Sequence, residues 1–146
     1  VRLPPVVRLH GDLTGVDEAG KTVTMRKGAE IDAYLARSLR TTADAAPIIT
    51  RESVYLDWLA ERLAPAARLD PDATHLAGFR RQVVSRGSRR LAGPDAIVHG
   101  TLTVTDAEAF AALLASGIGR HRTYGYGMLL LRPPQRPAAG RGIASC

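Results

Sequence analysis

The sequence predicts an α+β fold of the ferredoxin-like (RRM-like) type, in which an antiparallel sheet of order βαββαβ carries its helices on one face. Two segments with apolar residues at helical spacing support this prediction, because a pair of strand-like segments separates them. A further strand-like segment precedes them, and a short apolar run follows them. The 146 residues are enough for one domain with a buried core, which we expect over residues 1–134.

The first half of the chain is expected to contain a strand and two helices. Residues 6–13 predict the strand, and residues 21–25 predict a second short strand or an extended connector. Apolar residues recur at helical spacing over residues 29–40, which we interpret as a helical insertion. Thr50 is the expected N-cap of the next helix, and Pro65 ends it. The apolar stripe of that helix, expected in the core, comprises Val54, Tyr55, Trp58, Leu59 and Leu63.

A long β-hairpin is expected in the middle of the chain. Residues 65–74 are rich in Pro, Ala and Asp and predict a linker. Residues 75–85 and 96–105 then predict two strands, joined by a basic tip over residues 86–94.

The last part of the predicted domain is a capped helix followed by a strand. Asp106 is the expected N-cap and Gly117 the expected C′ residue. The inner face of the helix comprises Phe110, Leu113 and Leu114. Residues 128–131 predict a buried final strand, and residues 135–146 predict a flexible basic tail.

Positive charge is concentrated in the second half of the chain. The net charge is +6, and 18 of the 20 basic residues are Arg, which partly reflects a GC-rich coding bias. Residues 1–77 carry ten basic and eleven acidic side chains, whereas residues 78–146 carry ten Arg and only three acidic side chains. Such asymmetry is expected where one part of a protein meets a polyanion.

Five of these arginines lie within eleven residues of the predicted hairpin: Arg80, Arg81, Arg86, Arg89 and Arg90. We find no acid near them in the sequence pattern, so they would repel one another unless a polyanion or solvent relieves the repulsion. The two interpretations are a hairpin that grips an RNA stem and an exposed, disordered hairpin end.

A glycine-rich segment, residues 117–127, separates the last helix from the final apolar run. Glycine permits positive φ and close backbone approach, arginine suits phosphate, and tyrosine offers a flat face to a base. The segment therefore predicts a loop along which a nucleic acid backbone passes. Its candidate RNA-binding residues are Gly117, Gly119, Arg120, Arg122, Gly125, Tyr126 and Gly127. It is not a dinucleotide fingerprint, because it follows a helix and precedes a strand.

His121 is the candidate catalytic residue of this segment. Metal-free RNA cleavage needs a base that works near neutrality and a cation or donor beside the phosphate. His121 lies between Arg120 and Arg122 and has this chemistry, and Tyr124 is placed to help orient it. The alternative is that His121 only contacts phosphate or solvent.

Composition disfavours several other kinds of protein. Cys146 is the only cysteine, so there is no disulfide framework and no cysteine metal cluster. The four histidines show no zinc-site spacing, and we expect neither a metal nor a cofactor. No apolar run approaches the roughly 18 residues of a membrane span. We therefore expect a cytoplasmic protein without a membrane partner.

The pattern Gly117-x-Gly119 followed by Gly125-x-Gly127-x-Leu129-Leu130 resembles the glycine-rich loop of the RAMP superfamily of CRISPR-associated proteins. Residues 100–110 look like the strand and helix that lead into that loop. The sequence is similar to the repeat-RNA processing endoribonuclease of Cascade (CasE type), specifically over residues 97–133. The resemblance is to the second of that family's two ferredoxin-like domains.

This resemblance implies binding of CRISPR repeat stem-loop RNA together with other Cascade subunits. It also implies metal-independent cleavage, in which a ribose 2′-OH attacks the neighbouring phosphate and leaves a 2′,3′-cyclic phosphate. In the family a basic hairpin of the second domain grips the RNA stem, and that hairpin corresponds to the five arginines above. The general-base histidine and a helper tyrosine usually come from the first domain, so we expect another half or a partner to supply the base.

Two other functions remain open from the sequence. One is a small phosphatase-like hydrolase on the same fold, which predicts a compact oxyanion pocket built on an Arg-bearing loop. The other is a non-catalytic RNA-binding or structural subunit of a ribonucleoprotein.

Overall fold

The computed structural model describes residues 1–41 and 48–133, so the predicted basic tail over residues 135–146 lies outside the described residues. The strands are β1 (Arg2–Leu3), β2 (Val6–Arg8), β3 (Leu13–Val16), β4 (Thr22–Met25), β5 (Glu30–Asp32), β6 (Ala67–Leu69), β7 (His75–Arg86), β8 (Arg89–His99) and β9 (Leu102–Val104). The helices are α1 (Ala33–Arg40), α2 (Arg51–Leu63) and α3 (Ala107–Ser116), with a 3₁₀ turn η1 (Arg122–Tyr124). The α+β class is confirmed: antiparallel sheets and three helices make up the described part, consistent with a ferredoxin-like fold.

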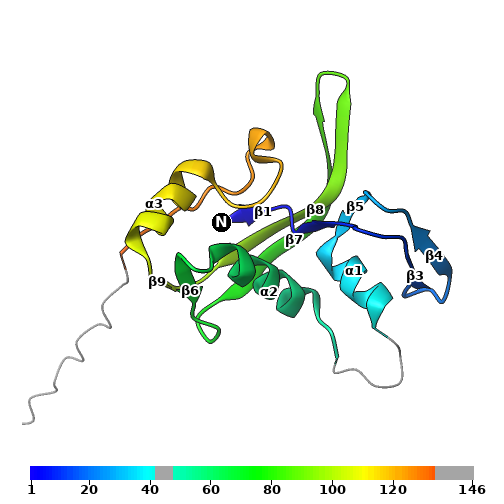
Figure 1. Cartoon of the computed structure of the whole chain (residues 1–146), viewed down its shortest axis with the longest axis horizontal. Coiled ribbons are helices and arrows are strands. Elements are labelled where there is room, and N and C mark those ends of the chain that lie inside the picture. Colours follow the sequence, from blue (N-terminus) through cyan, green and yellow to red (C-terminus); the bar gives the residue numbers. More distant parts are fainter. Residues whose placement is uncertain (42–47, 134–146) are drawn as a thin grey trace, which may run out of the picture.

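The central sheet has the order β1-β8-β7 and is antiparallel throughout. Strands β7 and β8 form the predicted hairpin, paired from His75 and His99 to Arg86 and Arg89. The far end of this hairpin extends beyond the other elements (Figure 1). Three further antiparallel ladders, β2-β5, β3-β4 and β6-β9, surround the sheet.

Helix α2 contributes more residues to the main core cluster than any other element, as its apolar stripe predicts. Tyr55 and Leu63 are 0% exposed, and Trp58 donates from Nε1 to the carbonyl of Val6 at 3.0 Å. Each large apolar side chain buried in this way stabilises the fold by about 1.5–3 kcal/mol. The helix also begins at the predicted cap, because Thr50 Oγ1 accepts from the N–H of Ser53 at 3.1 Å.

Helix α3 shows the predicted cap but only part of the predicted inner face. Asp106 Oδ1 accepts from the N–H of Ala109 at 3.0 Å, and Gly117 follows the helix with φ of 77°. Phe110 is buried and Leu113 packs against the core, as expected. Leu114 is 43% exposed, so its assignment to the inner face was wrong.

Several predicted elements have different boundaries in the structure, because short paired strands divide or shorten the predicted segments. The strand expected over residues 6–13 divides into β2 and β3, and the helix expected over residues 29–40 begins only at Ala33. Asp32 explains that start, since its Oδ1 accepts from the N–H of Tyr34 at 2.8 Å and caps α1. The expected linker over residues 65–74 contains β6, which pairs with β9.

The hairpin tip is much shorter than predicted. β7 ends at Arg86 and β8 begins at Arg89, so the turn consists of Gly87 and Ser88. Gly87 has φ of 60°, a conformation that glycine adopts without steric cost. The arginines expected in a loose tip are therefore held on paired strands.

The prediction of a buried final strand over residues 128–131 was wrong. These residues form no strand, and Met128 and Leu130 are 67% and 82% exposed. The N–H of Gly127 donates to the carbonyl of Arg2 at 2.9 Å, which brings the run to the free edge of β1. Because β1 comprises only two residues, it offers the following residues little backbone with which to pair.

Candidate functional site

The glycine-rich segment forms a loop that closes on itself. The N–H of Ile118 donates to the carbonyl of Gly127 at 2.9 Å, and Ile118 is 1% exposed. A Cβ on Gly127 would lie 2.1 Å from the carbonyl oxygen of Ile118, and one on Gly119 would lie 2.8 Å from the ring of Trp58. The close approaches that these two glycines permit are thus to the chain's own atoms. By contrast, a Cβ on Gly125 would meet open space.

Several N–H groups of the loop donate to carbonyls of the chain itself. The N–H of Tyr124 donates to His121, that of Gly125 to Arg122, and that of Gly127 to Arg2. Together with the N–H of Ile118, these four donors do not converge on an anion. The compact oxyanion cradle expected for a phosphatase-like hydrolase therefore receives no support from them.

His121 is held in an unusual backbone conformation. Its φ of 59° and ψ of 27° lie in the left-handed region, and within residues 1–41 and 48–133 it is the one non-glycine residue with positive φ. Such a conformation costs of order 1–3 kcal/mol and persists only where surrounding contacts hold it. Strain of this kind is often found at functional sites.

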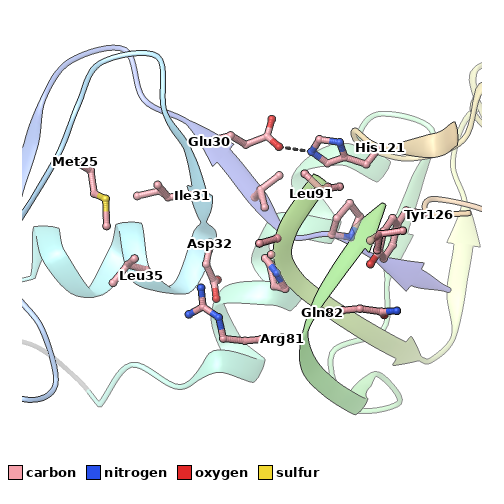
Figure 2. A pocket seen from close by; sticks show the side chains of 16 residues that line it. Met25, Glu30, Ile31, Asp32, Leu35, Arg81, Gln82, Leu91, His121 and Tyr126 are labelled. Carbon is pink, nitrogen blue, oxygen red and sulfur yellow. Dashed lines mark hydrogen bonds and ion pairs between the residues drawn. The ribbon is translucent and has the colours of Figure 1, made fainter. Parts of the chain in front are cut away.

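A carboxylate on β5 supplies the contact that holds this histidine. His121 Nε2 pairs with Glu30 Oε1, and Arg120 Nε lies 2.6 Å from Glu30 Oε2. The side chains of His121 and Glu30 are each only 18% exposed. In Figure 2 the two side chains point toward one another across the gap between β5 and the loop.

Sequence analysis missed Glu30. It lies 91 residues from His121 and belongs to no motif, so no local pattern identifies it. Its contacts change the interpretation of the loop, because Arg120 is already paired with a carboxylate. They also give His121 an orienting partner in addition to Tyr124, whose ring packs edge-on at a centroid distance of 6.2 Å.

The expectation that no acid lies near the hairpin arginines was wrong, because Asp95 pairs with one of them. It faces Arg80 in the strand register, and Arg80 Nε lies 2.9 Å from Asp95 Oδ2. Arg2 donates to both oxygens of the same carboxylate, at 2.7 and 2.8 Å. Asp95 is only 3% exposed. The hydrogen bonds from Arg2, and to a lesser extent the one from Arg80, hold its pKa below the ordinary value. Arg80 is therefore paired with a carboxylate, unlike the other four hairpin arginines in the described part of the chain.

The other four hairpin arginines, Arg81, Arg86, Arg89 and Arg90, are exposed and form no ion pair within the described part of the chain. Arg86 and Arg89 lie directly opposite each other at the turn. Like charges in this position destabilise the pairing unless an anion approaches.

Tyr126 is less available than a stacking platform would be. Its side chain is 5% exposed, and the guanidinium of Arg2 lies over its ring at 4.8 Å from the centroid. Burial raises the pKa of Tyr126 above its ordinary value. Arg122 also contacts the chain itself, because its Nη1 donates to the carbonyl of Ser116.

The base of the hairpin and the loop meet at one pocket of about 200 Å³. Arg81 from the hairpin, His121 and Tyr126 from the loop, and Glu30 from β5 all line it (Figure 2). The structure thus brings together one hairpin arginine and the candidate catalytic residue. Arg86, Arg89 and Arg90 lie farther out along the hairpin and do not line this pocket.

A family model described as CRISPR associated protein matches residues 4–133. The chain belongs to the CRISPR-associated protein family. No curated protein sequence matches it. The resemblance of the glycine-rich segment to CRISPR-associated proteins is confirmed at this level, and the subtype is not distinguished by the match.

The described part of this CRISPR-associated protein contains neither a helix that could span a membrane nor a cluster of metal-binding side chains. Over residues 1–41 and 48–133, none of the helices has both the length and the apolar character needed to span a bilayer. Within the same ranges, the His, Asp and Glu side chains form no group of three close enough to hold a metal ion. The described residues therefore offer an oriented imidazole and one exposed guanidinium group, that of Arg81, in the same pocket, with three further exposed arginines along the hairpin.

Proposed function

We propose that this CRISPR-associated protein binds CRISPR repeat stem-loop RNA and takes part in its metal-independent endonucleolytic processing to guide RNA. The proposal assigns it to the CasE-type subunits of a Cascade complex, in the cytoplasm and with other Cascade subunits as partners. The observation that carries the proposal is the projecting β7-β8 hairpin, which bears four exposed arginines without carboxylate partners in the described part and leads back to His121.

The hairpin suits an RNA stem for two physical reasons. A-form RNA is recognised mainly through its phosphates and shape, and guanidinium forks bind phosphate oxygens bidentately. Paired strands hold Arg86, Arg89 and Arg90 on a rigid projection, which lowers the entropy lost on binding. The like-charge contact between Arg86 and Arg89 is relieved when a phosphate lies between them.

His121 suits the base in a transesterification. With the Nε2 proton donated to Glu30, the lone pair on Nδ1 accepts the proton of the ribose 2′-OH. The O2′–P bond then forms as the P–O5′ bond breaks, and O5′ takes a proton from solvent. The products are a 2′,3′-cyclic phosphate and a 5′-OH. Arg81, the exposed hairpin arginine that lines the same pocket as His121, stabilises the charge that develops on the phosphate.

One observation favours a second candidate, a non-catalytic RNA-binding subunit. Glu30 pairs with both Arg120 and His121, so it joins the loop to β5 as an ordinary structural ion cluster does. In that case another domain or a partner subunit supplies the base, and this chain contributes only the arginine contacts that hold the RNA stem.

Both candidates are tested by incubating the protein with a repeat stem-loop RNA in EDTA, over a range of salt concentrations. Salt-sensitive binding with a 2′,3′-cyclic phosphate product supports processing, and binding without product supports the second candidate. His121→Ala is expected to lower cleavage about 100-fold or more while changing affinity little. Equal loss of cleavage and affinity would assign His121 to the grip. Absence of salt-sensitive RNA binding would contradict both candidates.

A further inference from the structure

The pocket at the base of the hairpin has features that the grip on an RNA stem does not use. Its apolar walls include Met25, Ile31 and Leu91, and its polar margin includes Arg81, Gln82 and His121 (Figure 2). These residues come from β4, β5, β7, β8 and the glycine-rich loop, so only the folded chain assembles them.

The size of the pocket restricts its ligand. Its volume of about 200 Å³ is below the roughly 300–1,000 Å³ of pockets that hold drug-sized molecules. A single planar ring system fits this description better than a whole nucleotide or a peptide. Apolar walls with a few polar groups at the margin are what a stacked, hydrogen-bonding ring requires.

The polar margin offers mainly donors. Gln82 accepts through Oε1 from Arg2 at 2.8 Å, which leaves its amide NH₂ to donate. Arg81 forms no ion pair with any described carboxylate, so its guanidinium is also a donor. Asp32 is already engaged by Arg51 at 2.6 Å and by Tyr55 at 2.9 Å. The pocket therefore suits a ring bearing carbonyl or ring-nitrogen acceptors, joined to an anionic chain.

One wall of the pocket is an unpaired strand edge. β1 pairs with β8 only at Ala96 and Ile97, whereas β7 pairs with β8 out to Arg89. The edge of β8 between these points lacks a second strand in the described structure, and residues 91–94 of it line the pocket. Pro94 lies on this edge and has no N–H, which disfavours the addition of a peptide strand there. The remaining backbone groups can bond the edge of a base.

We propose that this pocket binds one unpaired nucleobase of the RNA, displaced from the base of the stem that the hairpin holds. The inference rests on the proposed function, since the same RNA must occupy the hairpin. It adds a specificity element: the protein reads a nucleotide beside the stem as well as the stem's phosphates. Arg81 then lies where the displaced nucleotide meets the backbone.

Gly93 permits a clean test of the pocket. It lines the pocket, its φ is not positive, and a Cβ built on it meets nothing within 4 Å. Gly93→Leu therefore fills space in the pocket without backbone strain. Gly11 is a matched control, because it has the same freedom and does not line the pocket.

Affinities are measured for three RNAs: the bare stem-loop, the stem-loop with its unpaired flanking nucleotides, and the flanked form with abasic sites in the flank. We expect the flanked RNA to bind wild type about tenfold more tightly than the other two, a difference of about 1.4 kcal/mol. Gly93→Leu should abolish this difference without weakening binding of the bare stem-loop, and Gly11→Leu should preserve it.

The outcomes separate the inference from the function on which it rests. If the bare stem-loop binds but flanked and abasic RNAs bind equally well, the pocket inference is overturned and the proposed function stands. The same conclusion follows if Gly93→Leu keeps the full difference. If wild type does not bind the bare stem-loop, both proposals are overturned.

Discussion

Glu30 and His121 lie 91 residues apart in the chain and form one side-chain pair at the junction of β5 and the glycine-rich loop. The same carboxylate holds Arg120, so the loop is attached to β5 through the side chains of Arg120 and His121. This pair orients the imidazole while the backbone of His121 stays in the left-handed region. The loop's geometry is therefore set by a contact from the first quarter of the chain.

Glu30→Gln should lower the rate of RNA cleavage about tenfold or more, because the imidazole loses the charged acceptor that orients it. Affinity for the stem-loop should change less than about threefold, since the hairpin arginines are untouched. Single-turnover cleavage and filter binding measure the two effects. Glu108→Gln, on the exposed first turn of α3, is the matched control. An unchanged cleavage rate in the Glu30 variant would show that this pair has only a structural role.

Arg89→Ala combined with Arg90→Ala should weaken RNA binding and reduce the slope of log affinity against log salt by about 1.5, as two phosphate contacts are lost. Arg40→Ala combined with Arg68→Ala removes the same charge from exposed positions outside the hairpin and should leave the slope nearly unchanged. A salt titration of affinity for each double variant makes the comparison. Equal slopes in the two variants would exclude the hairpin as the RNA grip.

Asp95→Asn should lower the free energy of unfolding at neutral pH by about 2 kcal/mol, because buried hydrogen bonds to a charged group are lost. The folded-state pKa of Asp95 is lowered by Arg2 and Arg80, so its contribution is present above the ordinary carboxyl pKa. That contribution is lost as pH falls through the lowered value. The difference in urea unfolding between wild type and variant should therefore shrink as the pH falls below the ordinary Asp pKa of about 3.9. Asp72→Asn, at an exposed position, is the control; a constant difference at all pH values would contradict the assignment.

Gly127→Ala should destabilise the fold by more than about 3 kcal/mol, since its Cβ would overlap the carbonyl of Ile118 in addition to the cost of positive φ. Gly125→Ala is the matched comparison, because its φ of 84° is similar and its surroundings are open. That variant should lose only about 1–2 kcal/mol. Denaturant unfolding of both proteins distinguishes packing from backbone strain, and similar losses would show that the overlap at Gly127 is easily relieved.

The sequence alone determined the features that depend on local pattern. The apolar stripe with Tyr55 and Trp58 predicted the core helix, and Thr50 and Asp106 marked the starts of two helices. Helical spacing and cap chemistry act over a few residues, so they can be recognised without the fold. The two-stranded hairpin and the resemblance of the glycine-rich segment to CRISPR-associated proteins were available for the same reason.

Only the tertiary structure decided which side chains meet across the chain. Glu30 became the partner of His121, and Asp95 became the shared partner of Arg2 and Arg80, because strand pairing brings distant residues into contact. The apolar run after Gly127 stayed unpaired although its composition predicted a strand, since a strand needs backbone partners as well as apolar side chains. Charge and glycine content thus predicted an RNA-binding surface, while the pairing of elements determined which of the predicted residues already have partners within the described part of the chain.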